Sequence, residues 1–455
     1  MRHVALSCRT AGLSLIELLV ALALGLLVSA GIITIFLSTS ASNRVQTQMA
    51  RMQEDGRFAI GQLMDDLSSA NGFYCNNTGG VATPTSSGVF LDGLRSPTIY
   101  AKSFLASLSD NTASWGATSG TITYPKAPTA KYDMPSFLYM RGYNCTGSAD
   151  CAPVAPSFLG GTAATAGTAL GNRVIGTDVL TVRFLDGSRG WRLGGTSTIV
   201  PNTADGSIAS IKLVPATGEP AVTAFGSNMA LLADCSTAQV FAVTGKGTSA
   251  LVPDDANNFG KPIALQPQSA PRLFDFVNDM RNVTYYVQVV SDDGTETGQK
   301  TGALMRRVNG TTVPVPDQEL IRGVERLTFR YGIEDSSGGV RYLTADQVDS
   351  RISNAIACPP TTKGQTVTDP GCLWRAVKSI EVSLLMAGTN TLPMLSSPEL
   401  SFVYTPDSSD GTNAPVTPSV TDTGKLAIQP SAQGFSDQRL RRQFSALVML
   451  RNYNP

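Results

Sequence analysis

Histidine is the first residue to consider, because most familiar catalytic sites depend on it. The chain has 455 residues and one histidine, His3, which lies before a long apolar segment. Ser-His-Asp and Cys-His catalysis, and zinc sites that contain histidine, all need an imidazole. If a leader that contains His3 is removed, the mature chain has no histidine. The sequence then excludes these mechanisms and leaves only lysine, tyrosine or carboxylate chemistry formally open.

The cysteines are the next candidates, either for disulfide bonds or for a metal site. They are Cys8, Cys75, Cys145, Cys151, Cys235, Cys358 and Cys372. Removal of a leader with Cys8 would leave an even number outside the cytoplasm, where disulfide bonds persist. Short spacing favours the pairs Cys145–Cys151 and Cys358–Cys372. The pair Cys75–Cys235 follows only by default, since six cysteines allow fifteen pairings. The chain has no C-x2-C pair, which argues against a four-cysteine metal site.

Two groups of carboxylates stand beside glycines, and oxygen clusters of this kind can bind calcium. Asp292 and Asp293 precede one glycine, and Asp407 and Asp410 precede another. An Asp-Gly pair after a strand is also a common hairpin turn. The turn is the favoured interpretation, and calcium binding stays open. The chain has no P-loop, nucleophile elbow or dinucleotide-binding fingerprint.

The charge balance argues against binding to nucleic acid. The chain has 35 Lys+Arg and 35 Asp+Glu, whereas phosphate binding is driven by an excess of clustered basic residues. The clusters Arg306–Arg307 and Arg439–Arg442 lie among predicted strands. We interpret them as solvated edges or subunit contacts. Only 15% of residues are charged, which is typical of a loop-rich, β-rich body that leaves the cytosol.

Residues 13–37 form a long apolar segment. As a helix it would measure about 37 Å, more than the roughly 30 Å of a bilayer core. Arg2 and Arg9 precede it, so the positive-inside rule places the N-terminus in the cytoplasm and the rest of the chain outside. Glu17 stands inside the segment, and an unpaired carboxylate in a membrane helix costs several kcal/mol. Glu17 is therefore a functional candidate, which an ordinary signal anchor or secretory signal peptide would not explain.

The sequence GLSLIELLVAL at 12–22 resembles the class III signal of type IV prepilins. In that family a dedicated peptidase cuts after the glycine, here Gly12, and N-methylates the new first residue, here Leu13. Leucine departs from the phenylalanine usual at this position. The resemblance implies that residues 1–12 are a leader peptide. It also implies that Glu17, at the fifth mature position, neutralises the amine of Leu13 in a neighbouring subunit during assembly.

The apolar segment is predicted to continue as one helix over residues 13–70, with the transmembrane part at 13–37. Beyond residue 44, apolar side chains recur with a period close to 3.6 between charged ones, which predicts an amphipathic helix lying on a head. The sequence RMQEDGRFAI at 51–60 and the aromatic-Cys element at 72–75 resemble the PilW family of minor pilins. Three later segments also resemble that family, namely 319–335, 376–386 and 441–452.

The head, residues 71–455, is predicted to be rich in β-structure. Runs with strand character occur at 178–185, 284–290, 324–331, 377–386 and 444–450. Stretches rich in Gly, Ser, Thr, Ala and Pro are predicted to be long loops or insertions, at 76–96, 109–131, 145–174, 195–223 and 404–435. Residues 281–452 carry the PilW-like elements, and 76–280 is an expansion without a recognised resemblance. The predicted fold class is α+β and pilin-like, with a long N-terminal helix packed on an enlarged β-rich head.

The resemblance implies a minor pilin, a structural subunit with no catalytic activity and no cofactor. Such a subunit primes assembly of a type IV pilus, and the large head favours a place at the tip. The implied partners are the prepilin peptidase, the major pilin, other minor pilins, a PilY-type tip adhesin and inner-membrane lipid. The chain would cross the inner membrane once, with its head in the periplasm, before it reaches the pilus tip on the cell surface.

Two other classes of protein stay open. A J-type pseudopilin of a type II secretion system shares the signal, the long helix and an enlarged β head, and neighbouring genes would distinguish the two. A membrane-anchored periplasmic enzyme is the third class. The absence of histidine from the mature chain and the presence of Glu17 both argue against it.

Overall fold

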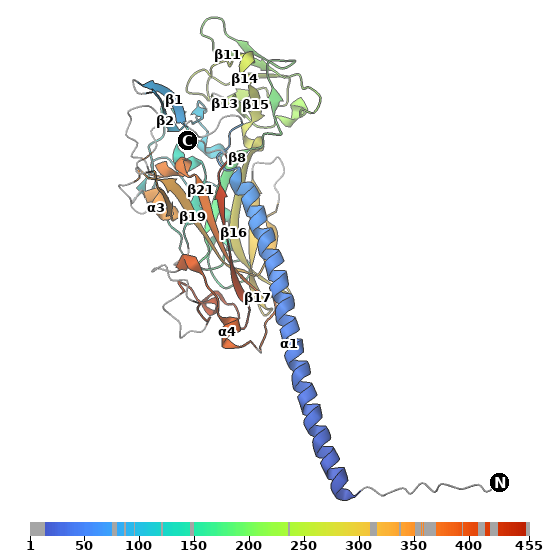
Figure 1. The fold of residues 1–455 in the computed structure, drawn as a ribbon. Coiled ribbons are helices and arrows are strands. Elements are labelled where there is room, and N and C mark those ends of the chain that lie inside the picture. The colour runs from blue at the N-terminus through green and yellow to red at the C-terminus, as the bar shows by residue number, and fades with distance from the viewer. Residues whose placement is uncertain are drawn as a thin grey trace, which may run out of the picture.

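The computed structural model has the predicted α+β architecture, in which a long N-terminal helix lies against a head of largely antiparallel sheets (Figure 1). The fold class is therefore confirmed. The described residues are 14–74, 80–85, 88–94, 96–119, 122–145, 150–234, 237–309, 316–335, 338–350, 356, 358, 370–393, 395–407, 415–418 and 426–451.

Helix α1 (Leu15–Ser68) has 54 residues and two halves with different surroundings. Residues 15–39 are all exposed, and this half projects from the head (Figure 1). In the second half, buried residues recur every three or four positions at Gln48, Met52, Gly56, Ala59, Leu63 and Asp66, and Leu67 and Ser68 are buried at the end of the helix. Since this spacing puts them on one helical face, the second half packs along the head.

Two antiparallel sheets form the body of the head beside α1. The first has the order β18 (Gln318–Arg322), β17 (Lys300–Asn309), β16 (Met280–Ser291), β8 (Val179–Leu185) and β7 (Arg141–Tyr143). The second has the order β20 (Val340–Leu343), β19 (Val324–Glu334), β21 (Ser379–Ala387) and β22 (Arg441–Met449). Strands β8, β16, β19, β21 and β22 correspond to the five predicted strand runs, which are confirmed.

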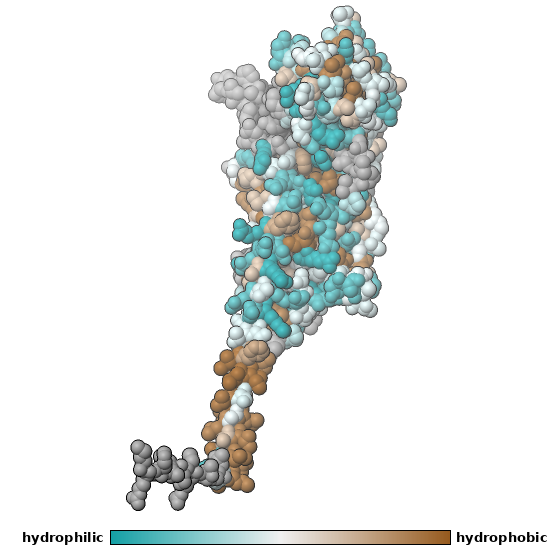
Figure 2. Space-filling model, turned by 90° about the vertical axis from the view of Figure 1, so that its right-hand side faces the viewer, coloured by the Kyte–Doolittle hydropathy of each residue, from teal (hydrophilic) through white to brown (hydrophobic). Residues whose placement is uncertain are grey.

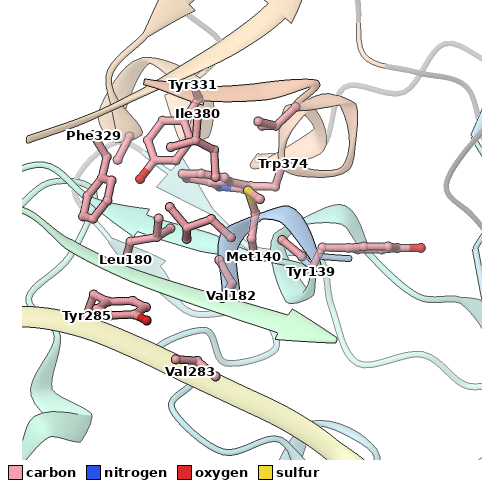
Figure 3. Packing of buried hydrophobic residues seen from close by; sticks show 14 of the residues in the cluster. Tyr139, Met140, Leu180, Val182, Val283, Tyr285, Phe329, Tyr331, Trp374 and Ile380 are labelled. Carbon is pink, nitrogen blue, oxygen red and sulfur yellow. The ribbon is translucent and has the colours of Figure 1, made fainter. Parts of the chain in front are cut away.

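The main core lies between these two sheets. Figure 3 shows Leu180 of β8 and Tyr285 of β16 on one side of it, with Phe329 and Tyr331 of β19 on the other. The fully buried Trp374 packs edge-on with Tyr331 inside the core, with its ring centroid 4.9 Å from that of Tyr331 (Figure 3). Because α1 contacts β21 and β22 of one sheet and β18 of the other, it is held by both sheets at once.

A second sheet system, here called the distal unit, lies at the end of the head farthest from the free end of α1 (Figure 1). Its strands are β10 (Thr198–Pro201), β11 (Ile208–Lys212), β14 (Ala250–Pro253), β13 (Ala238–Thr244), β12 (Met229–Ala233), β15 (Arg272–Asp275) and β9 (Trp191–Arg192), joined by β3 (Thr98–Ile99) and β6 (Tyr132–Asp133). Its own core includes Trp191, Phe241 and Leu251. The short helix α2 (Phe276–Asp279) connects β15 to β16, so most of the distal unit is an insertion between β8 and β16.

Part of the loop prediction was wrong, because strands lie within three of the stretches expected to be loops. They are β1 (Gly80–Thr85) and β2 (Gly88–Leu94), β4 (Thr118–Ser119) and β5 (Ile122–Thr123), and β10 and β11 of the distal unit. These strands have only two to seven residues and stand in stretches rich in Gly, Ser and Thr, so each is too short to show a clear alternation of apolar residues. Pairing with a neighbouring strand stabilises them, and such pairing leaves a weak signal in the local sequence. The remaining short helices are α3 (Ala345–Ser350) and α4 (Ser397–Leu400).

Candidate functional site on the long helix

The N-terminal end of α1 carries the predicted assembly residue. Glu17 lies in the first turn, where its Oε2 accepts a hydrogen bond of 3.0 Å from the backbone N–H of Ser14. A carboxylate in the first turn also faces the positive end of the helix dipole. Gly12 and Leu13, the predicted cleavage and methylation residues, lie outside the described residues. The role of Glu17 as an assembly contact therefore stays a prediction.

The exposed half of α1 is long and apolar enough to cross a membrane. Every Leu, Ile, Val and Phe side chain from Leu15 to Leu37 is at least 51% exposed. Figure 2 shows these side chains as an apolar column that protrudes from a mostly polar head. A helix that is apolar all round is stable only where other apolar groups cover it. The segment thus has the properties of a membrane anchor or signal.

We use the term seat for the surface of the head on which the second half of α1 packs. One part of the seat is a close approach between Gly56 and Phe444 of β22. A Cβ built on Gly56 would lie 2.6 Å from the ring of Phe444, so only glycine allows the aromatic ring to lie this close to the helix. The sequence alone marks Gly56 as a weak point in the helix, since glycine costs up to about 1 kcal/mol relative to alanine. The contact with Phe444 gives this glycine a structural role within the PilW-like element 51–60.

Asp66 forms the polar end of the seat. Its carboxylate accepts two hydrogen bonds from Arg306 of β17, with Nε 2.7 Å from Oδ2, and one from the Tyr285 hydroxyl at 2.6 Å. Burial raises the pKa of Tyr285 far above its ordinary value, and the charge of Asp66 raises it further, so the hydroxyl stays a donor. Burial alone would lower the pKa of Arg306, but the hydrogen bond and charge of Asp66 outweigh burial and raise it. The Asp66 side chain is therefore held by the Arg306 guanidinium and by the neutral phenol of Tyr285.

The interpretation of Arg306–Arg307 as a solvated edge was wrong, because both residues form ion pairs within the chain, while the alternative of a subunit contact stays a prediction. Arg306 binds Asp66, and Arg307 lies 3.4 Å from Asp110 and 3.8 Å from Asp317. Sequence reasoning gave Asp66 no partner, since Arg306 lies 240 residues away in the chain. A buried carboxylate on the apolar face of the helix, at the spacing of Ala59 and Leu63, is the signal that could have indicated a buried partner.

The chain leaves α1 through a left-handed residue. Asn71 has a φ of 62°, a conformation that asparagine adopts more readily than most residues. Its N–H donates to the carbonyl of Arg183 at 2.7 Å, and its Oδ1 accepts from the N–H of Met140 at 3.1 Å. Phe73 then packs edge-on against Tyr139. The aromatic-Cys element at 72–75 thus begins as a tie between the helix end and the body, although Cys75 lies outside the described residues.

Two buried ion pairs stabilise the sheet on which α1 lies. Arg441 of β22 binds Glu325 of β19 at 2.7 Å, with both side chains fully buried. Arg326 binds Asp407 at 2.6 Å, also with almost no exposure. The expectation that the cluster 439–442 is a solvated edge was wrong for Arg439 and Arg441, which are buried, since each reaches inward to polar partners. These partners lie far away in the sequence and leave no local pattern.

The calcium hypothesis finds no support among the described carboxylates. Asp293 accepts hydrogen bonds of 2.8 Å from both the N–H and the hydroxyl of Thr295, as in a polar turn, and Asp292 accepts from the N–H of Gln299. Asp407 is already bound to Arg326, and Asp410 lies outside the described residues. No group of three or more His, Cys, Asp and Glu side chains suited to a metal occurs in the part of the chain that the structure describes.

Both pairs of cysteines expected from short spacing form disulfide bonds in the structure. Cys145–Cys151 closes a short loop after β7, and Cys358–Cys372 joins the segment before β21. Cys75 and Cys235 lie outside the described residues, so their pairing stays a prediction. Thiol labelling of the denatured, unreduced mature protein would test it, with near-zero labelling expected.

Comparison with known proteins adds one finding. The model of the family "Type IV Pilus-assembly protein W" (PilW) matches residues 284–452. The matched region starts within β16 and contains β17 to β22, which include the strands β18, β21 and β22 on which α1 packs. No curated protein and no solved structure matches the chain. The resemblance to the PilW family is therefore confirmed over the C-terminal region.

Proposed function

We propose that this chain, which carries a PilW-family region at residues 284–452, is a minor pilin of a type IV pilus. It acts as a structural and assembly subunit and not as an enzyme. A prepilin peptidase cuts after Gly12 and methylates Leu13. Before assembly, the subunit is located in the inner membrane with its head in the periplasm. It then helps to prime a pilus and becomes part of the filament near the tip.

The observation that carries this proposal is the division of α1 into two halves. One half is apolar all round with a single carboxylate, Glu17, and the other half is fixed to the PilW-matching strands by Gly56 and Asp66. A free apolar half can exchange one apolar environment for another, first lipid and then neighbouring helices. The carboxylate suits that exchange, because it can neutralise the amine of a neighbouring subunit.

The proposed partners follow from the same arrangement. The major pilin and other minor pilins would contact the free half of α1, since packed helices form the centre of such filaments in this family. The head would face a PilY-type tip adhesin. A place at the tip is favoured because the distal unit enlarges the head beyond what closely stacked subunits in every turn could accommodate.

Deletion of the gene in its native host tests the proposal. We expect fewer or no surface pili, restored by the wild-type gene, and we expect the protein in sheared pili in small amounts. Mass spectrometry of that material should show an N-terminus at Leu13 with one added methyl group. A normal number of pili together with loss of protein secretion would instead identify a J-type pseudopilin.

A further inference from the structure

A groove lies between α1 and the head just above the exposed apolar half of the helix. It measures about 430 Å³. Leu37, Ala41 and Val45 form its helical wall, and their spacing of four residues puts them on one face. Leu392 and Leu395 contribute the opposite wall. The groove is therefore apolar on both sides and continuous with the free half of the helix.

The wall on the head side is held in place by hydrogen bonds. The N–H of Leu392 donates to the carbonyl of Gln438 at 2.9 Å, close to β22. Glu399 accepts hydrogen bonds from the N–H and the hydroxyl of Ser396, at 2.8 and 2.7 Å, at the start of α4. The bond from Leu392 ties this wall to the segment before β22, and the bonds between Ser396 and Glu399 order the first turn of α4.

The groove lies at the level where a bilayer surface would be. Leu37 ends the apolar span, and the polar headgroup layer above a bilayer core is about 5–8 Å thick. Arg44 stands seven residues beyond Leu37, about 10 Å along the helix. Side chains on a helix lean toward its N-terminus, so Arg44 leans back toward the membrane and into the headgroup layer.

The rim of the groove is cationic on the side of the helix. Arg44 lines both this groove and an adjacent polar one that also contains Arg51, two turns further along the same helical face. Glu399 is the carboxylate at the groove, and its oxygen already accepts the two hydrogen bonds from Ser396. From the membrane outward, apolar Leu37, Ala41 and Val45 alternate with the three serines (Ser38, Ser40, Ser42), and Arg44 lies near the outer end.

We propose that this groove binds one anionic phospholipid of the membrane that α1 spans. The upper end of an acyl chain would lie against Leu37, the glycerol region would lie against Ala41, and Arg44 would pair with the phosphate. The inference rests on the proposed membrane insertion of α1 and goes beyond the pilin function. The bound lipid would fix the tilt of the head over the bilayer, and it would have to leave when the subunit is extracted.

Native mass spectrometry of the full-length protein in detergent tests this site. The protein is mixed with equal amounts of phosphatidylglycerol and phosphatidylcholine of the same chain length. We expect at least threefold more protein with bound phosphatidylglycerol. Arg44→Gln should reduce this preference to about one, and Ala41→Trp should reduce binding of both lipids at least threefold by filling the groove. Arg57→Gln, an exposed arginine elsewhere on α1, should leave the preference unchanged.

Three results would overturn the site: equal binding of the two lipids by the wild type, no effect of Ala41→Trp, or an equal loss in Arg57→Gln. Excess inorganic phosphate should not displace the lipid, because the acyl chain supplies much of the binding. Displacement by phosphate would overturn the lipid site and show that Arg44 binds anions in general.

If a neighbouring helix is the true occupant, lipid binding is absent and Ala41→Trp impairs pilus incorporation. Lipid preference in a protein that is absent from pili would keep the site and reject the pilin proposal.

Discussion

Three residues of α1 show how one helix meets three different environments. Glu17 stands among exposed apolar side chains, Gly56 lies under an aromatic ring, and Asp66 sits in a polar seat. A carboxylate in an apolar setting needs a partner, whereas one that already has an arginine and a phenol does not. The chain therefore satisfies Asp66 internally, whereas an interaction of Glu17 outside the subunit stays a prediction.

Glu17→Ala should impair incorporation into pili while membrane insertion and leader cleavage continue. Insertion depends on apolar length, which the change does not reduce, but the Leu13 amine of a neighbour loses its counter-charge. Loss of one partner of a buried pair costs roughly 3–5 kcal/mol, so incorporation should fall at least about a hundredfold. Glu17→Gln should be nearly as harmful. Blots of sheared pili and membranes measure this, with Glu54→Ala as an exposed control on the same helix. Wild-type amounts of the Ala variant in pili would show that Glu17 is no assembly contact.

Gly56→Ala and Gly61→Ala form a matched pair on α1. A Cβ at Gly56 would collide with the Phe444 ring, whereas a Cβ at Gly61 would meet nothing within 4 Å. We expect Gly56→Ala to lower the free energy of unfolding by about 1–2 kcal/mol, because forced repacking outweighs the gain in helix propensity. Gly61→Ala should raise it by about 0.5–1 kcal/mol through propensity alone. Thermal melts of the purified protein test both, and equal shifts in the two variants would refute a role for the close contact.

At the scale of elements, the seat of α1 depends on strands that are distant in sequence. The last turn of the helix binds β16 and β17 through Asp66, and its middle packs on β21 and β22. All these strands fall within or begin the PilW-matching region. The helix and that region therefore form one structural unit, although more than two hundred residues separate them.

Asp66→Ala should loosen the last turns of α1. It leaves the Arg306 guanidinium and the Tyr285 hydroxyl without their shared acceptor, at a cost of about 2–3 kcal/mol. Hydrogen exchange at residues 60–68 should accelerate accordingly, while exchange in the distal unit should not change. Asp65→Ala, at the exposed neighbouring position, is the control. In a double-mutant cycle, Asp66→Ala should cost much less once Arg306 is also replaced, and full additivity would contradict the direct pair.

The sequence predicted best those elements whose signal is local. The helix and five strands carry a clear 3.6 or alternating period, and the two short disulfides follow from spacing. The partners of Asp66, Gly56 and Arg441 could not be predicted, because each lies on another element. Short strands such as β10 owe their structure to pairing and were missed for the same physical reason.

At the scale of the whole molecule, the distal unit is joined to the body at a charged junction. Asp279, at the end of α2, accepts a hydrogen bond of 2.6 Å from Arg189 and another of 2.9 Å from the N–H of Asp275. Asp186 and Arg281 form a second ion pair beside it, at 2.9 Å. The connections from β8 to β9 and from β15 to β16 both pass through this junction, so its ionisation affects how firmly the two units are held together.

Asp279 should make the stability of the junction depend on pH. Burial raises its pKa from 3.8 to about 6, against the opposing effect of Arg189. Since the folded state holds the proton more tightly than the unfolded state, this stabilisation is complete below about pH 4 and is lost as pH rises through about 6. The unfolding free energy of the wild type minus that of Asp279→Asn should therefore fall between pH 4 and 7, by up to about 3 kcal/mol. Denaturant titrations at several pH values measure it. A difference that grows with pH would mean that the ion pair with Arg189 dominates instead.

The attachment of α1 along its length has a mechanical consequence. Its ties to the head are spread over twenty residues, from the bond of Gln48 to Asn390 up to that of Ser68 to Arg451, the residue that follows the last strand by two positions. A pull on the free end of α1 acts parallel to the helix axis and loads these ties together, in shear, where no single contact has to break first. A force along α1 would thus pass into β21 and β22 and, through Asp66, into β16 and β17. The distal unit lies at the far end of the head from the free half of α1 (Figure 1). A change in its size would therefore leave the contacts between α1 and these strands in place.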